Sequence, residues 1–385
     1  MPNQFLSDEF GDIEDYFVTD YRLIDNFVGD SLWGWGNNNG GQLGINLGPF
    51  QDRSTPVTTF SGGINWKQVS AGRSHTAAIK TDGSLWIWGE GTNGRLGTND
   101  TTLRSTPVTT FAGGNDWKQV SCGNNHTAAI KTDGSLWTWG GNTYGQIGNN
   151  TTADRNTPVT TFTGGNNWKS VSAGVSNAAT TAAIKTDGSL WVWGHGRYIG
   201  IDDVNDRSIP VTTFAGGTNW KQVSTGVATV AIKTDGTLWD TTNDAFTWAQ
   251  RYSVATNWKS VSSGGATQFF IAAIKTDGSL WIWGRGNEGQ LGTNDTTTRS
   301  TPVTTFAGGN NWKSVSVGEN HVAALKTDGT LWTWGSGADG RLGNFATTNR
   351  STPVTTFAGG TNWKSVDCGF YHMAAVKSGL NVDLS

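Results

Sequence analysis

The feature that most constrains the fold of this chain is a repeat. The stretch Lys118–Gly140, KQVSCGNNHTAAIKTDGSLWTWG, returns with few changes, and its Leu-Trp pair occurs seven times at intervals of 42 to 54 residues. A period of about 50 residues indicates a stacked or ring-like array of one supersecondary unit. Because such an array folds as one body, the 385 residues predict one domain rather than two or three.

Tryptophan supplies the core of each unit. A Trp-Lys marker also occurs seven times, and six of the Leu-Trp pairs run on into Trp-Gly, so these three motifs contain all but one of the 21 tryptophans. The remaining one is Trp248. Only 35% of the residues are hydrophobic and 54 are glycine. The chain therefore depends on buried indoles, each of which removes on the order of 200 Å² from water.

Each unit contains four short strand-like runs, which in the second complete copy are Trp117–Gly123, His126–Thr132, Ser135–Gly140 and Thr157–Phe162. They alternate apolar with small or polar residues, as half-buried strands do. The Asp-Gly turn between the second and third runs is a strong hairpin signal. These features predict a four-stranded antiparallel meander.

Proline identifies the outermost strand, because a residue without an N–H is tolerated at the edge of a sheet but not inside it. Six copies of the fourth run contain proline: Pro56, Pro107, Pro158, Pro210, Pro302 and Pro353. The first run has small residues, such as Ser121 to Gly123, and is expected near a crowded axis. The sequence thus predicts an all-β, seven-bladed β-propeller of four-stranded antiparallel blades.

The two ends of the repeat region are half units. Ser31–Gly36 and Ser54–Phe60 read as third and fourth strands, whereas Trp363–Gly369 and His372–Lys377 read as first and second strands. Pairing of Val376 with the neighbourhood of Leu32 would join the halves into one blade and close the ring. We therefore predict a propeller over residues 31–377, an acidic and aromatic segment over residues 1–30, and a tail over residues 378–385.

The charge distribution limits the classes of partner. Residues 1–30 carry eight acids and one arginine, a local balance of −7, so the net charge of −3 leaves +4 on the remainder. Neither part shows the Lys/Arg clustering of a nucleic-acid surface. No signal peptide and no apolar run of ~18 residues is present, which predicts a soluble protein without a membrane partner. The N-terminal segment either packs across the propeller or docks the ring to a larger assembly.

Catalytic, metal and cofactor sites are not predicted. Four histidines share one repeat position (His75, His126, His321 and His372), and Asn177 is assigned to that position in the third unit. One histidine per blade cannot supply the three or four ligands of a metal site, so a structural hydrogen bond is the preferred interpretation. Cys122 and Cys368 lie two units apart and read as small buried residues. The chain contains no Gly-x-Ser-x-Gly, Walker or Cys-x-x-Cys motif.

The motif G-x-x-H-T-A-A-I-K-T-D-G-S-L-W-x-W-G, with Gly-Gln-Leu-Gly at Gly41–Gly44 and Gly289–Gly292, resembles the regulator of chromosome condensation repeat family over about residues 31–377. The resemblance implies a seven-bladed propeller. It implies little about function, because the family includes a nucleotide exchange factor for a GTPase, a plant ultraviolet-B photoreceptor and a β-lactamase inhibitor.

Two of those family functions can be compared with the residues. The photoreceptor has Trp inside the Gly-x-x-His motif, whereas this chain has Arg73-Ser74, Asn124-Asn125, Glu319-Asn320 and Phe370-Tyr371, which argues against light sensing. The acidic segment and the lack of long insertions argue against nucleotide exchange, which stays as the alternative function. The nearly identical repeats also resemble proteins of tailed marine bacteriophages, which implies a virion or tail-associated protein. The expected location is then the virion or the host cytoplasm.

The loops on one face of the predicted propeller vary between copies, whereas the turns on the other face hardly change. Loops on a rigid scaffold carry recognition, and arginine and aromatic residues dominate contact hot spots. We therefore predict a protein- or glycan-binding face; neutral drift of solvent loops is the competing interpretation. The candidate residues are Arg73, Arg95, Tyr144, His195, Arg197, Tyr198, Phe269, Phe270, Arg285, Glu319, Phe370 and Tyr371.

The fifth Leu-Trp unit departs from the others. Asp240 to Ser253 contains neither Trp-Gly nor Ser-Thr-Pro-Val, so short or irregular outer strands are expected there. The departure is either decay of the repeat, which we favour, or a notch for a partner.

Overall fold

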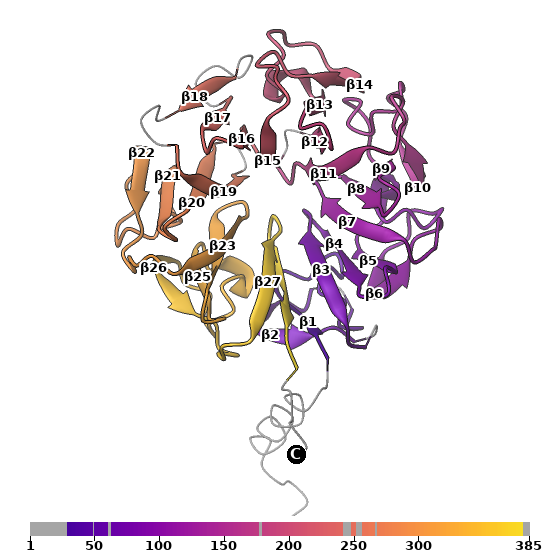
Figure 1. Cartoon of the computed structure of the whole chain (residues 1–385). Helices are drawn as coiled ribbons and strands as arrows, with labels where there is room; N and C mark the ends of the chain where they lie inside the picture. Colours follow the sequence, from indigo (N-terminus) through magenta and orange to yellow (C-terminus); the bar gives the residue numbers. More distant parts are fainter. Residues whose placement is uncertain are drawn as a thin grey trace, which may run out of the picture.

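The computed structural model describes residues 29–379, apart from 49, 61–62, 177–178, 242–247, 252–255 and 266–267. The described residues form seven four-stranded antiparallel sheets around a central axis (Figure 1). This is the predicted seven-bladed propeller. The predicted segment 1–30 lies outside the described residues except for Gly29 and Asp30, and the predicted tail does so beyond Gly379.

The strand bounds agree with the sequence prediction to within about two residues. From inner to outer strand, the sheets are β3 (Trp66–Ala71), β4 (His75–Lys80), β5 (Leu85–Gly89) and β6 (Arg104–Thr109); β7 (Trp117–Cys122), β8 (His126–Lys131), β9 (Leu136–Gly140) and β10 (Arg155–Thr160); β11 (Trp168–Ala173), β12 (Thr180–Lys185), β13 (Leu190–Gly194) and β14 (Arg207–Thr212); β15 (Trp220–Thr225), β16 (Thr229–Lys233), β17 (Leu238–Asp240) and β18 (Ala249–Arg251); β19 (Trp258–Gly264), β20 (Phe270–Lys275), β21 (Leu280–Gly284) and β22 (Arg299–Thr304); β23 (Trp312–Val317), β24 (His321–Lys326), β25 (Leu331–Gly335) and β26 (Arg350–Thr355); and β27 (Trp363–Cys368), β28 (His372–Lys377), β1 (Ser31–Gly36) and β2 (Arg53–Thr58). Three short 3-10 turns, η1 (Thr92–Gly94), η2 (Gly196–Tyr198) and η3 (Ala338–Gly340), lie in the loops after third strands.

The ring closes as the half units predict. Strand β1 pairs antiparallel with β28, and Leu32 lies opposite Val376 in the register. One sheet therefore contains strands from both ends of the repeat region, in the order β2-β1-β28-β27. The six predicted prolines all lie in outermost strands, where their missing N–H removes no inner ladder bond.

The hairpin between the second and third strands shows why the Asp-Gly pair repeats. The Oδ1 atom of Asp82 accepts hydrogen bonds from the backbone N–H and the hydroxyl of Ser84, at 2.9 and 2.7 Å. Gly83 has a φ of 83°, and a Cβ there would lie 2.1 Å from the carbonyl oxygen of Asn115 in the next blade link. Only glycine fits both the turn and this close approach.

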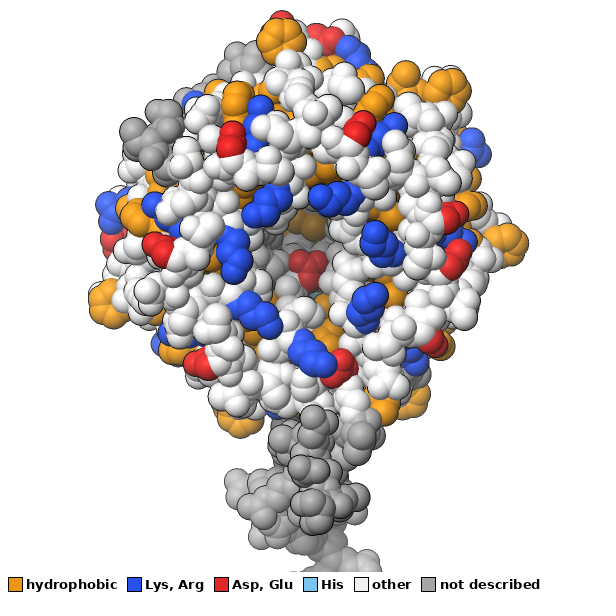
Figure 2. Space-filling view, viewed as in Figure 1, with side chains coloured by type: hydrophobic (Ala, Val, Ile, Leu, Met, Phe, Trp, Pro, Cys, Tyr) orange, Lys and Arg blue, Asp and Glu red, His pale blue; other side chains and the backbone are white. Residues whose placement is uncertain are grey.

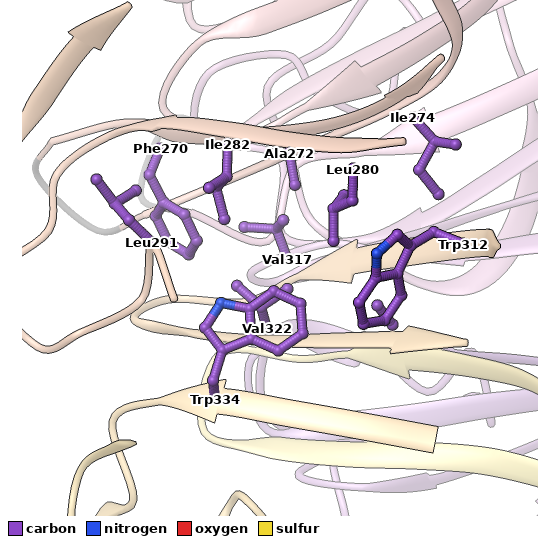
Figure 3. Packing of buried hydrophobic residues seen from close by; sticks show 11 residues of the cluster. Phe270, Ala272, Ile274, Leu280, Ile282, Leu291, Trp312, Val317, Val322 and Trp334 are labelled. Carbon is purple, nitrogen blue, oxygen red and sulfur yellow. The ribbon is translucent and has the colours of Figure 1, made fainter. Parts of the chain in front are cut away.

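The hydrophobic core lies between adjacent blades. In the cluster of Figure 3, side chains of β20 and β21 face those of β23, β24 and β25, and the indoles of Trp312 and Trp334 meet at 6.2 Å between ring centroids. The tryptophan of each Trp-Lys marker also lies beside the amine of the lysine that ends a second strand, as for Lys326 at 4.9 Å from the Trp312 centroid. The predicted aromatic core is thus a series of seven inter-blade layers among the described residues.

The fifth Leu-Trp unit has the short outer strands that the sequence predicts, since β17 and β18 contain three residues each. Trp248 takes the place of the missing Trp-Gly indole: it packs on Trp220 with centroids 5.5 Å apart and donates to the carbonyl of Ile199. A partly buried ion pair joins the two short strands, between Asp240 and Arg251 at 2.8 Å. The unit keeps its indole although it lost the motif.

Candidate functional site

The variable loops lie together on one face, which we call the loop face; the Asp-Gly turns lie on the other, the turn face. Turns between first and second strands bond to one another around the axis. The Arg73 N–H donates to the carbonyl of Gly123 at 3.2 Å, and the Phe370 N–H donates to that of Gly72 at 3.0 Å. The loop face is therefore one connected surface whose side chains have fixed relative positions.

In one group of candidate residues, side chains from three blades contact one another. The Arg73 guanidinium lies 4.6 Å from the ring centroid of Phe370 and 5.7 Å from that of Tyr371. Arg341 lies 5.3 Å from the Tyr371 centroid and 3.6 Å from Glu319. Burial raises the pKa of Glu319, and the neighbouring arginines oppose this shift. The group is a cation–aromatic network with one carboxylate.

A second group surrounds the loop after β13. The His195 ring lies between Tyr144 and Tyr198, with centroids 4.4 and 5.1 Å away. The Nδ1 atom of His195 accepts a hydrogen bond from the Arg197 N–H at 3.3 Å. Arg197 itself is exposed, whereas the three rings are half-buried. The stack fixes the base of an exposed arginine.

A cleft of about 470 Å³ opens beside this stack, between the sheets β15–β18 and β19–β22. Its lining includes Arg197, Tyr198, Phe269, Arg285 and Arg299, and contains no carboxylate among the described residues. Four of the predicted candidates thus meet in one concavity. Arg285 also donates to the side-chain oxygen of Asn320 at 3.3 Å, which links the cleft toward Glu319.

Three predicted candidates are buried, which corrects the expectation that they are exposed. Phe270 occupies the histidine position at the start of β20 and is wholly buried in the inter-blade core. Phe370 is covered by Arg73 and is 2% exposed. Arg95 is 4% exposed, because its guanidinium donates to Thr92 and to the carbonyl of Asn124. These three side chains shape the loop face from beneath it.

Arg341 and Arg299 contact the candidate groups although the sequence analysis did not select them. Arg341 follows η3 at the same place that Arg95 holds after η1, so the shared Gly-Arg-Leu-Gly motif is the signal that could have identified it. Six exposed aromatic rings at one repeat position were also missed. They end the repeated Thr-Thr-Phe motif, beyond the fourth strand where we placed Phe162: Phe60, Phe111, Phe162, Phe214, Phe306 and Phe357.

Three of the four histidines, His75, His126 and His372, connect neighbouring blades through a hydrogen bond. The Thr76 hydroxyl donates to the carbonyl of Gln42 at 2.8 Å, so it accepts the bond from Nε2–H of His372, also at 2.8 Å. The same carbonyl accepts the indole N–H of Trp88 at 2.9 Å. The arrangement recurs at His75 and Thr127 and at His126 and Thr181. Burial lowers the pKa of His126 to about 4 and that of His372 to about 3.

In the third unit, Thr180 holds the histidine position, since it lies opposite Gly194 as His75 lies opposite Gly89. Our assignment of Asn177 to this position was wrong, and Asn177 itself lies outside the described residues. The insertion before β12 shifts the position by three residues, and the match of Thr180–Lys185 (TTAAIK) to His126–Lys131 (HTAAIK) is the sequence signal that could have identified Thr180. Among the described residues, no group of three or more His, Cys, Asp or Glu side chains could hold a metal ion.

The axial channel is lined by small polar residues. In six blades a serine hydroxyl accepts the backbone N–H of the neighbouring inner strand, as Ser70 does from Cys122 at 3.0 Å. Asp367 takes the seventh place and accepts from the Ala71 N–H at 2.9 Å and from the Ser316 hydroxyl at 2.8 Å. Burial raises the pKa of Asp367. Cys122 and Cys368 are free and buried beside the channel, as predicted.

The described part of the chain contains no helix with the length and apolarity needed to cross a membrane. This finding concerns helices alone.

Comparison with known proteins identifies relatives that share the repeat. The chain is 31% identical to the ultraviolet-B receptor UVR8 of Arabidopsis thaliana over 92% of its own length and 72% of the receptor. It is 27% identical to the human E3 ubiquitin-protein ligase HERC2, over 89% of this chain but only 6% of that protein. The solved structure of Prp20p from Saccharomyces cerevisiae, described with its binding to Gsp1p and histones, superimposes with a TM-score of 0.76 at 16% identity, over 94% of this chain and 95% of that one.

The model of the regulator of chromosome condensation (RCC1) repeat matches five stretches, residues 30–79, 82–130, 133–180, 277–325 and 328–376. The unmatched stretch, residues 181–276, contains the unit with the short strands β17 and β18. Together the matched stretches cover more than half of the chain, which therefore belongs to the RCC1 repeat family.

Proposed function

We propose that this protein is a non-catalytic interaction module that binds a protein partner through its loop face. The observation that carries the proposal is the cleft beside the sheets β15–β18 and β19–β22, where Arg197 and Tyr198 of the loop after β13 converge with Phe269 and Arg285 from two other loops. Arginine and aromatic side chains in a concavity are the residue types that dominate binding energy at protein interfaces. The rigid ring beneath them keeps the ordering cost of binding low.

The cleft chemistry suggests what kind of segment binds. Three arginines line it, and Arg299 among them is ion-paired with Asp295 at 2.6 Å. An acidic segment therefore gains charge-assisted hydrogen bonds from Arg197 and Arg285. Tyr198 and Phe269 offer aromatic surface beside those charges. The expected ligand is an acidic peptide that carries at least one aromatic residue.

Relatives support binding to proteins in general terms. Prp20p is described as binding Gsp1p and histones, and this chain shares its fold. Regulation of a GTPase by nucleotide exchange remains the alternative, and a nucleotide-release assay tests it directly. Neither the virion setting nor the glycan partner expected from the sequence gains support from these relatives, so both remain predictions.

A displayed random-peptide library, selected on the purified full chain, tests the proposal. We expect enriched peptides to contain acidic and aromatic residues, and their Kd to rise at least about tenfold in the double variant Arg197→Glu and Arg285→Glu. Arg53→Glu, in the outer strand β2 of another sheet, is the matched charge control. The proposal fails if no peptide is enriched, or if the control weakens binding as much as the cleft variant.

A further inference from the structure

Every lysine of the chain lies at one of two repeat positions. Seven follow the tryptophan of the Trp-Lys marker, and seven end the second strands. The first set, which we call the inner lysine ring, is exposed in every blade: Lys67, Lys118, Lys169, Lys221, Lys259, Lys313 and Lys364. No clustering of positive charge is visible along the sequence, because these residues are about 50 positions apart.

The inner lysine ring lies on the turn face, around the opening of the channel. Trp66, directly before Lys67, lies opposite Lys80, and the Asp-Gly turn follows Lys80 at once. Inner strands surround the axis, so the second residues of all seven come together there. Figure 2 shows the result as a circle of Lys and Arg side chains around the central opening, with a carboxylate inside it.

The two sets of lysines differ in what they contact. In the second set, each amine lies 4.3 to 5.3 Å from two tryptophan centroids, as Lys185 does from Trp168 and Trp191. In the inner ring, Lys364 has an ion pair with Asp30 at 2.6 Å. Within the described part of the chain, the other six inner lysines have no ion-pair partner. The inner lysine ring is therefore a concentrated and largely uncompensated positive charge.

Residues 1–28 join the propeller at this ring. The Trp66 N–H donates to the carbonyl of Asp30 at 3.2 Å, and the Gly379 N–H donates to that of Gly29 at 2.9 Å. Asp30 thus lies between Lys67 and Lys364 of the ring. The preceding 28 residues contain seven acids and one arginine, a net charge of −6, with the acids between Asp8 and Asp25.

We propose that the inner lysine ring is a docking site for the acidic stretch of residues 8–25 of the same chain. A chain spans at most about 3.3–3.6 Å per residue, so the stretch between Asp8 and Gly29 is long enough to extend up to about 70 Å. A four-stranded blade is about 15 to 20 Å across, so all seven lysines lie within reach. Tethering gives an effective concentration of the order of millimolar, which turns several weak surface ion pairs into lasting contact.

This docking places the acidic stretch on the turn face and leaves the loop face free. It is independent of the protein partner proposed above, because the two faces share no lining residue. Of the two roles that the sequence left open for residues 1–30, the proposal adopts packing on the propeller.

Zero-length carbodiimide cross-linking of the full chain tests the proposal, because the reagent joins carboxylates only to amines in contact with them. The sample is an equal mixture of unlabelled and nitrogen-15-labelled protein, so that peptide masses separate links within one molecule from links between two. We expect links within one molecule from the acids of residues 8–25 to lysines around the ring, including Lys169, Lys221 and Lys259 far from Asp30. The tryptophan-bound lysines are the internal control and should link at least about fivefold less.

Three results would overturn the proposal. They are the absence of links to residues 8–25, links confined to Lys67 and Lys364 beside the tether, and links found only between differently labelled molecules, which would identify a second copy as the occupant. Raising the salt to about 1 M, where the screening length falls to ~3 Å, should lower the yield several-fold. The variant Lys169→Gln, Lys221→Gln and Lys259→Gln should lower links from residues 8–25 to the remaining ring without changing the thermal midpoint, since these side chains are exposed.

Discussion

The ring consists of two unequal arcs. Four consecutive sheets, β23–β26, β2-β1-β28-β27, β3–β6 and β7–β10, each begin their second strand with histidine; we call them the histidine arc. The other three sheets, the divergent arc, have Thr180, Ala228 and Phe270 at that position. The cleft that gathers four of the twelve candidate residues lies in the divergent arc. Four other candidates, in the network of Arg73, Glu319, Phe370 and Tyr371, lie in the histidine arc, so both arcs present arginine and aromatic side chains on the loop face.

The arcs differ in how adjacent blades are joined. Three junctions that begin at a histidine have the full chain of bonds from imidazole to threonine hydroxyl to loop carbonyl. At the fourth, Met373 replaces threonine, and the described residues provide no hydrogen-bond partner for either ring nitrogen of His321. The divergent arc relies instead on apolar packing, such as that of Phe270 and Ile271. Two kinds of junction therefore hold the same architecture.

Acid should destabilise the histidine arc, and this is the largest effect that we expect. Burial holds the pKa of His126 at about 4 and that of His372 at about 3, below the ordinary value of 6.5. The unfolded chain therefore binds protons that the native state does not. The contribution of these histidines to the free energy of unfolding is complete above pH 6.5 and is lost as the pH falls toward 4. Each such histidine contributes up to ~1.4 kcal/mol per pH unit in that range.

Thermal unfolding followed across this pH range checks the prediction. The double variant His126→Phe and His372→Phe copies the residue found at Phe270, and its midpoint should fall less steeply with acid than that of the parent protein. A parallel fall in both proteins would show that the histidine arc is not the source of the acid sensitivity.

Tryptophan truncation compares the arcs at one equivalent position. Trp139 is fully buried and its indole N–H donates at 2.9 Å, whereas Trp248 is 7% exposed and donates at 3.4 Å. We expect Trp139→Ala to lower the free energy of unfolding by about 3–5 kcal/mol, the usual cost of removing a large buried ring. Trp248→Ala should cost less. Denaturant midpoints measure both, and an equal cost would mean that Trp248 replaces the lost indole completely.

Asp367 allows the smallest and most specific test. In the described inner strands, six of the seven channel positions are serine and the seventh is Asp367. Burial raises the pKa of Asp367 above 3.8. Since the native state binds this proton more tightly than the unfolded chain, the contribution of Asp367 to stability falls as the pH rises through its folded pKa. Asp367→Ser should therefore raise the thermal midpoint at neutral pH and have little effect near pH 4. A lower midpoint at neutral pH would contradict this.

Much of the fold could be predicted from local sequence. The period, the Asp-Gly turns and the edge prolines specified the meander, and the half units at Leu32 and Val376 specified closure of the ring. Prediction of the candidate site was less complete. Phe270 and Phe370 are loop-adjacent in the sequence but buried in space, because burial depends on neighbours from other blades. The error at Asn177 was of another kind, since counting back from Lys185 along TTAAIK gives Thr180, and the pairing of Thr180 with Gly194 agrees with that count.

The sequence by itself determined the number of blades, their strand order and the ring closure, since these depend on periodicity and on backbone rules that act within one unit. Only the tertiary structure decided which side chains meet across units. Seven lysines about 50 residues apart form a ring because the inner strands share one axis. Four candidates meet in one cleft because loops of neighbouring blades converge there. Contacts between repeats depend on geometry around the circle, which no single repeat encodes.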